Sequence, residues 1–86
     1  MTYYYRKCLC FADMTGSRFD ALTWDIGDKI AWIAAFQFPL ASRYVYGYGR
    51  TREEACRSLW IALVDYYGVK DDAVSDDMLS KIAVVF

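Results

Sequence analysis

Histidine is absent from this 86-residue chain, and proline occurs once. Without histidine the chain lacks the commonest general base of enzymes and a common zinc ligand. Its three cysteines, Cys8, Cys10 and Cys56, do not by themselves complete a four-ligand zinc site. Runs of 18 or more apolar residues are also missing, so the sequence predicts no membrane span. We therefore expect a protein that is not an enzyme, with no catalytic residue, no metal and no cofactor.

The cysteines and the N-terminal segment indicate a compartment. Cys8 and Cys10 lie two residues apart in a predicted strand, where side chains point in parallel and do not bridge easily. The first ten residues have charges after an aromatic run, without a long apolar region or a small-residue cleavage site, which is not the pattern of a signal peptide. Reduced, mostly buried thiols are expected, as is typical of a cytoplasmic protein.

Composition predicts one domain over residues 1–86, with a modest core that depends on large side chains. Hydrophobic residues make up 57% of the chain and aromatic residues 19%, which is high for a soluble protein, and some are expected at the surface. The net charge of −1 hides an asymmetry: residues 1–57 are net basic and residues 58–86 net acidic. A dedicated nucleic-acid binder is usually clearly basic, so a protein partner is favoured over nucleic acid.

Short apolar patterns predict several antiparallel strands. They are expected at residues 3–11, 18–26, 29–38 and 43–48, with turns at 12–17 and 39–42. The segment 18–26 also has helical spacing through Phe19, Leu22 and Ile26. However, Gly27-Asp28 between LTWDI and KIAWI is typical of a two-residue hairpin loop, which favours a strand. Pro39 cannot donate a ladder hydrogen bond, so we expect the preceding strand to end there.

A capped amphipathic helix is predicted over residues 52–67. In a capping box, the Thr51 hydroxyl accepts from the Glu54 N–H and the Glu54 carboxylate accepts from the Thr51 N–H. Gly68 is the expected left-handed stop. With Trp60 at its border, the broad apolar face holds Ala55, Cys56, Leu59, Ala62, Leu63, Tyr66 and Tyr67.

The C-terminal part is predicted to hold an acidic loop at 69–77 and a short helix that Ser75 caps and that ends near residue 81. Residues 82–86 either extend this helix or form a last strand, which their β-branched content favours. The expected fold is therefore α+β: a small antiparallel sheet of three to five strands, with one main amphipathic helix packed on one face.

Tyr44, Tyr46 and Tyr48 form an aromatic stripe, because alternate side chains of a strand share one face. We expect this stripe to pack under the helix. The alternative is an exposed aromatic platform for a protein or for single-stranded RNA.

Two further groups are candidate contact sites for a partner. The first is acidic: Asp71, Asp72, Asp76 and Asp77, which are either solvated caps and loop charges or a docking patch. These aspartates lack the spacing of a calcium loop. The second lies on the outer helix face: Arg57, Ile61 and Val64, which are either scattered surface residues or part of an interface within or between chains. Such exposed apolar residues would also suit a homodimer.

Residues 30–68 resemble the strand–strand–helix unit of HicB-like antitoxins. The residues that carry the resemblance are Phe38-Pro39, Gly47, Gly49, Thr51, Glu53, Glu54, Ala55, Leu59 and Leu63. The helix also resembles that of small phage accessory proteins. HicB-like antitoxins usually carry a DNA-binding segment after this unit, and we expect no room for one after Gly68.

The resemblance to phage proteins implies an anti-CRISPR-like protein in the bacterial cytoplasm. Such a protein binds a host defence complex and inhibits it by covering a surface. The resemblance to HicB-like antitoxins implies a binder that neutralises a small ribonuclease toxin. From the residues alone, an RNA-binding module that uses the tyrosine stripe is a third hypothesis.

Overall fold

Along the chain, one helix precedes a three-stranded sheet and the other helices follow it. The computed structural model describes residues 2–27 and 29–80, except for the side chain of Ile26. The elements follow in the order α1 (Tyr3–Thr15), β1 (Arg18–Ile26), β2 (Lys29–Gln37), β3 (Val45–Gly49), α2 (Arg52–Tyr67), the 3₁₀ helix η1 (Asp71–Ala73) and α3 (Asp76–Ser80). The fold is α+β, as expected, and its strand number lies within the predicted range.

The first element is a helix, so the strand predicted at residues 3–11 is wrong. Lys7, Cys8, Phe11 and Ala12 are buried, which is the spacing of one helical face. Tyrosine and phenylalanine favour strands by local preference, but packing against α2 overrides that preference here. The predicted turn at 12–17 is correspondingly shorter, since α1 continues to Thr15 and ends at Gly16 with φ 68°.

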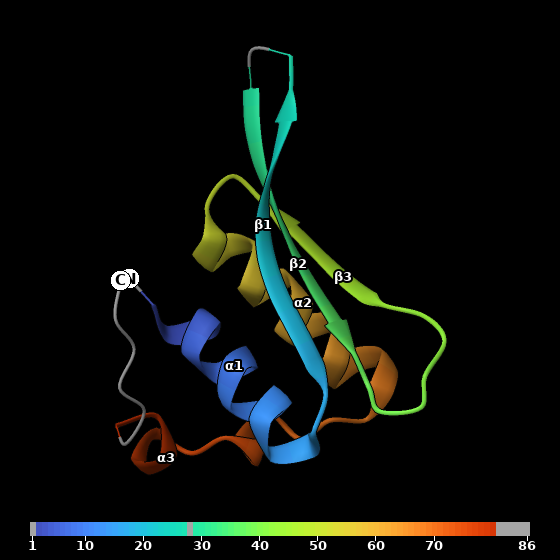
Figure 1. Cartoon of the computed structure of the whole chain (residues 1–86). Coiled ribbons are helices and arrows are strands. Elements are labelled where there is room, and N and C mark those ends of the chain that lie inside the picture. Colours follow the sequence, from blue (N-terminus) through green and yellow to red (C-terminus); the bar gives the residue numbers. More distant parts are fainter. Residues whose placement is uncertain (1, 28, 81–86) are drawn as a thin grey trace.

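The sheet is an antiparallel meander in the order β1-β2-β3. Ile26 pairs with Lys29, so the connection is the two-residue loop that the sequence predicts, and Gly27 takes a left-handed φ of 66°. The predicted strands at 18–26 and 29–38 are thus confirmed, although β2 ends at Gln37. The strand expected at 43–48 begins at Val45. The β1–β2 hairpin projects beyond the helices (Figure 1).

Helix α2 has the predicted limits. The Thr51 Oγ1 accepts from the Glu54 N–H at 3.1 Å, and Gly68 is left-handed with φ 70°. The reciprocal bond differs from the prediction, because the Glu54 carboxylate accepts from the Arg50 N–H at 2.8 Å and not from that of Thr51. Ser75 caps α3 by accepting from the Met78 N–H at 3.2 Å. The prediction for residues 82–86 falls outside the described residues.

Helices α1 and α2 both lie on one face of the sheet, so the expectation of one main helix is incomplete (Figure 1). The core between these layers is built from Cys8, Phe11, Ala34, Phe36, Val45, Ala55, Cys56, Leu59, Trp60 and Leu63, with smaller contributions from Ala12, Val74 and Leu79. Trp60 belongs to this core and not to a border, whereas Tyr66 is 82% exposed and Tyr67 is also exposed, contrary to the predicted helix face. None of the helices in the described part of the chain is long and apolar enough to cross a membrane.

Candidate functional site

The tyrosine stripe of Tyr44, Tyr46 and Tyr48 is exposed, so the expectation that it packs under the helix is wrong. Val45 and Gly47, at the alternate positions of β3, are buried against α2, which directs the tyrosines to the opposite face. The three rings stack in sequence, with centroids 6.1 Å apart for Tyr44–Tyr46 and 6.3 Å apart for Tyr46–Tyr48. The stripe is therefore an ordered ladder of rings that faces outward.

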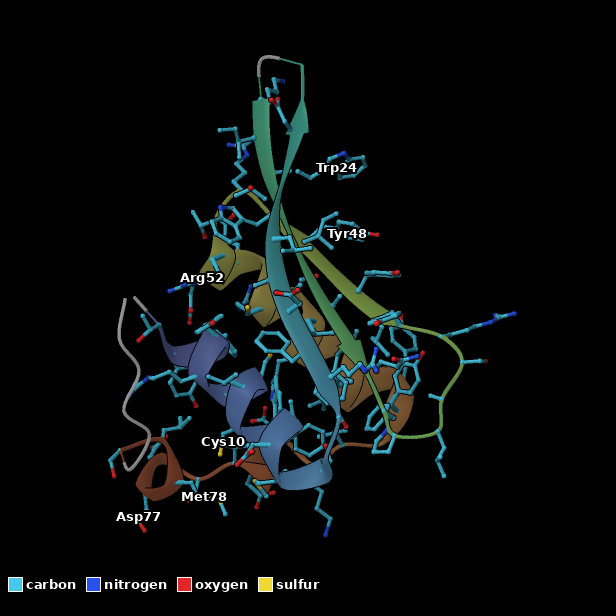
Figure 2. The ribbon with its side chains drawn as sticks, in the orientation of Figure 1. Cys10, Trp24, Tyr48, Arg52, Asp77 and Met78 are labelled. Atoms are coloured by element: carbon cyan, nitrogen blue, oxygen red, sulfur yellow. The ribbon has the colours of Figure 1, made fainter. Side chains whose placement is uncertain are left out.

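The stripe belongs to a larger apolar surface, which we call the open sheet face. Its members are Leu22, Trp24, Ile33, Tyr44, Tyr46 and Tyr48, and all except the partly buried Ile33 are 40–57% exposed. The register joins them: Tyr48 pairs with Ile33, which pairs with Leu22. Figure 2 shows Trp24 and Tyr48 on one side of the sheet and Arg52 on the other. Apolar side chains of all three strands therefore form one surface that no described element covers.

Leu22, Trp24 and Ile33 are not among the site residues predicted from the sequence. A signal for them exists, because Leu22 and Trp24 alternate along β1 and the hairpin loop fixes their register against β2. That register, carried across to β3, places Leu22 on the same face as the tyrosines. This alternation and register show that the residues share a face of the sheet. They predict an exposed surface only when it is known which face the helices cover.

The outer flank of α2 continues this surface around the edge of β3. Arg57 and Ile61 are exposed, and with Tyr48, Gly49, Glu54 and Ser58 they line a shallow groove. Val64 does not belong to it, because this side chain is partly buried against the core. Two of the three candidates on the outer helix face thus adjoin the tyrosine stripe, and the third has a structural role.

The four candidate aspartates lie away from the open sheet face. Asp77, at the start of α3, lies toward the opposite end of the molecule from Trp24, and Tyr48 lies between these two levels (Figure 2). Asp76 precedes it in the same helical turn, where carboxylates suit the positive end of the helix dipole. Asp72 is exposed in η1. The structure therefore does not unite the aspartates with the tyrosine stripe in one site.

Asp71 differs from the other three candidate aspartates because its carboxylate contacts two buried side chains, those of Trp60 and Lys7. Its Oδ1 accepts from the Trp60 indole N–H at 2.9 Å and lies 3.8 Å from the Lys7 Nζ. The Lys7 side chain is buried, with its Nζ 4.8 Å from the Trp60 ring centroid and 5.2 Å from that of Tyr3. Asp71 therefore contributes to the fold, while its side chain is 80% exposed and stays a candidate contact for a partner.

Replacing Asp71 with alanine is expected to lower the free energy of unfolding by about 1–2 kcal/mol, because the buried indole N–H of Trp60 loses its acceptor. Asp72→Ala is the matched control, since both carboxylates are exposed but it is Asp71 that bonds to Trp60, and loss of Asp72 should change stability by less than about 0.5 kcal/mol. Urea unfolding followed by tryptophan fluorescence measures both. Equal stability of the two variants would contradict the role assigned to Asp71.

The cysteines are free thiols, and Cys8 and Cys56 are fully buried. The interaction with Cys56 and burial raise the pKa of Cys8 well above its ordinary value, which favours the neutral thiol. Cys10 is partly exposed, and burial together with the Asp13 charge raises its pKa. Among the described residues, no three His, Cys, Asp or Glu side chains are grouped so that they could hold a metal ion.

The class of structure is therefore a three-stranded antiparallel sheet with two helices on one face and an apolar, aromatic surface on the other. Comparison with protein-family models, curated proteins and solved structures finds no match to this chain. The resemblance to HicB-like antitoxins and small phage proteins thus remains an expectation from its motif.

Proposed function

We propose that this chain is a non-enzymatic protein-binding module that inhibits a host defence complex in the manner of anti-CRISPR proteins, by covering a surface which that complex needs. The observation that carries the proposal is the open sheet face. Tyrosine and tryptophan are among the residue types that most often dominate binding energy at protein interfaces, and here they are exposed on one face of the sheet. The assignment to phage proteins and to the bacterial cytoplasm rests on the resemblance of the helix.

A protein partner fits this surface better than RNA does. Binding of single-stranded nucleic acid combines stacked aromatic rings with a positively charged groove that follows the phosphates. Within β1 and β2, the charged residues on the open face are Arg18, Asp20 and Lys29, which have mixed signs. Arg43 and Arg50 lie at the two ends of the stripe and not along it. The tyrosines therefore supply stacking surface without a continuous basic path.

An antitoxin of the HicB-like type is the second candidate. The observation that supports it is the succession of β2, β3 and α2 over residues 29–67, which is a strand–strand–helix order. The same open sheet face would then cover a small basic ribonuclease toxin. The identity of the captured partner separates the two candidates.

Affinity capture from bacterial lysate, with and without nuclease, tests the proposal when the wild type is compared with two variants. Tyr46→Ala removes the central ring of the stripe and should lower recovery of the partner about tenfold or more. Tyr66→Ala is the matched control, because it removes an equally large exposed ring from the end of α2. Mass spectrometry identifies and quantifies the captured proteins.

Each result of this capture has a defined meaning. A defence-complex subunit that survives nuclease and is lost with Tyr46→Ala supports the proposal. A small basic ribonuclease with the same behaviour transfers the function to the antitoxin candidate. Nucleic acid alone, or proteins that disappear with nuclease, would overturn protein binding in favour of RNA. Self-association in place of a partner would indicate a homodimer through this face.

A further inference from the structure

Strand β3 presents an edge that no strand in the described part of the chain pairs with, since β2 occupies its other side. Natural sheets protect exposed edges with charges, proline or bulges. The opposite edge strand, β1, has such protection in Arg18, Asp20 and Asp25. Residues Val45–Gly49 contain no charge and no proline, and their two glycines make the strand permissive for pairing. The β3 edge is therefore open to a further strand.

The surroundings of this edge provide contacts for both faces of an added strand. Neighbouring strands lie about 4.8 Å apart, and their side chains alternate between the two faces. On one face, an added strand would lie beside the tyrosine stripe. On the other, it would meet the groove beside α2, where Arg57 and Ile61 are exposed. This placement also gives a reason for Ile61, an apolar residue on the otherwise polar flank of α2.

We propose that β3 is a docking edge, which receives an extended acidic segment of a protein partner as a fourth strand. The backbone of β3 supplies the ladder hydrogen bonds, as in other cases of strand addition. The tyrosine stripe and Ile61 select apolar side chains on alternate faces of the segment. This inference rests on the proposed function, because it specifies how the partner is held.

Charge decides which segment fits. Arg43 and Arg50 flank β3 and Arg57 lies on the α2 flank; all three are exposed, and none has an ion pair in the described part of the chain. Glu54 is the acidic residue in the groove, and its carboxylate is already bonded to the Arg50 N–H. Acidic side chains of the segment would therefore meet unpaired arginines.

The same charges disfavour a second copy of this chain at the β3 edge. Antiparallel pairing of two β3 strands would bring the Arg43 end of one copy against the Arg50 end of the other, at both ends of the ladder. Like charges opposite one another destabilise a strand pair. An acidic segment has no such conflict.

A displayed library of random peptides of about 12 residues, selected on the immobilised full chain, tests the docking edge. We expect enrichment of acidic peptides in which alternate residues, facing the tyrosine stripe, are apolar, and in which one residue between them, facing Ile61, is also apolar. The double variant Arg50→Glu/Arg57→Glu should bind the selected peptide roughly tenfold or more weakly and should enrich basic peptides in a new selection. Arg18→Glu, at the edge of β1, is the matched control and should change neither result.

Peptide backbone and apolar contacts are tested separately. Two versions of the selected peptide are N-methylated at alternate residues in complementary sets. One set should lose binding and the other should retain it, because only alternate N–H groups of a strand face β3. Ile61→Ser should weaken binding of the unmethylated peptide, whereas Met14→Ser, an exposed apolar residue on α1, should not.

The docking edge is overturned if no alternating acidic peptide is enriched, if both methylated peptides bind equally well, or if the Arg50→Glu/Arg57→Glu variant binds as the wild type does. The two proposals fail separately. A captured partner that depends on Tyr46 but not on Arg50 or Arg57 would remove the docking edge and keep the proposed function. Absence of any captured protein would remove the proposed function itself.

Discussion

Replacing Gly47 with alanine is expected to lower the free energy of unfolding by about 3 kcal/mol, because helix α2 lies directly on this residue. A Cβ at Gly47 would clash with the backbone nitrogen of Leu59 and the backbone oxygen of Ala55, and would lie 2.7 Å from the Leu59 Cα. Backbone atoms cannot move aside as the end of a flexible side chain can. The helix must therefore shift away from β3 and lose contacts with the core. Urea unfolding measures the change.

Gly16→Ala is the control for this prediction. Gly16 has a positive φ of 68°, and a Cβ at this position would meet nothing within 4 Å, so its replacement tests backbone strain without a clash. We expect a cost of about 1–2 kcal/mol for the left-handed conformation. A Gly47→Ala variant as stable as the wild type would show that α2 does not lie this close to β3.

Replacing Glu53 with alanine is expected to lower the free energy of unfolding by about 2 kcal/mol, because this residue of α2 caps helix α1. Its carboxylate accepts from the backbone N–H groups of Tyr4 and Tyr5. Thr2, at the N-cap position of α1, makes no side-chain capping bond, and the first turn contains no acidic residue. The first turn of α1 thus has no negative charge of its own, and Glu53 of α2 provides one there. Urea unfolding followed by far-UV circular dichroism measures the loss.

Glu53→Gln separates charge from hydrogen bonding. Glutamine keeps one acceptor oxygen of similar reach but loses the charge that interacts with the helix dipole, so we expect about half of the alanine effect. Glu54→Gln is a second control, because Glu54 is exposed and bonds only to the start of its own helix. If Glu53→Ala proves no more destabilising than Glu54→Gln, the capping role across the helices is wrong.

The sequence predicted the β2–β3–α2 unit well because its signals are local. Thr51, Glu54 and Gly68 act through bonds to residues a few positions away, and the Gly27 turn sets the register of the hairpin next to it. Such interactions can be predicted from a short stretch of sequence. The Glu54 carboxylate accepts from the Arg50 N–H and not from the predicted Thr51 N–H, because cap geometry depends on how the chain enters the helix.

The error at α1 has a physical cause. Tyrosine, cysteine and phenylalanine gave residues 3–11 a local preference for a strand, and the buried Lys7 concealed the helical face that it shares with Cys8 and Phe11. A lysine is rarely buried unless partnered, and although Tyr3 is near in sequence, the partners Trp60 and Asp71 come from distant positions. No window around residue 7 contains that information.

The sequence by itself determined an α+β domain, the hairpin of β1 and β2, the limits of α2 and the common face of Tyr44, Tyr46 and Tyr48. These follow from side-chain period, turn chemistry and capping, which act over short distances. Only the tertiary structure decided which face of the sheet the helices cover. That choice depends on the fit of α2 over Gly47 and on the docking of α1 beside it, and it left the tyrosines exposed together with Leu22 and Trp24.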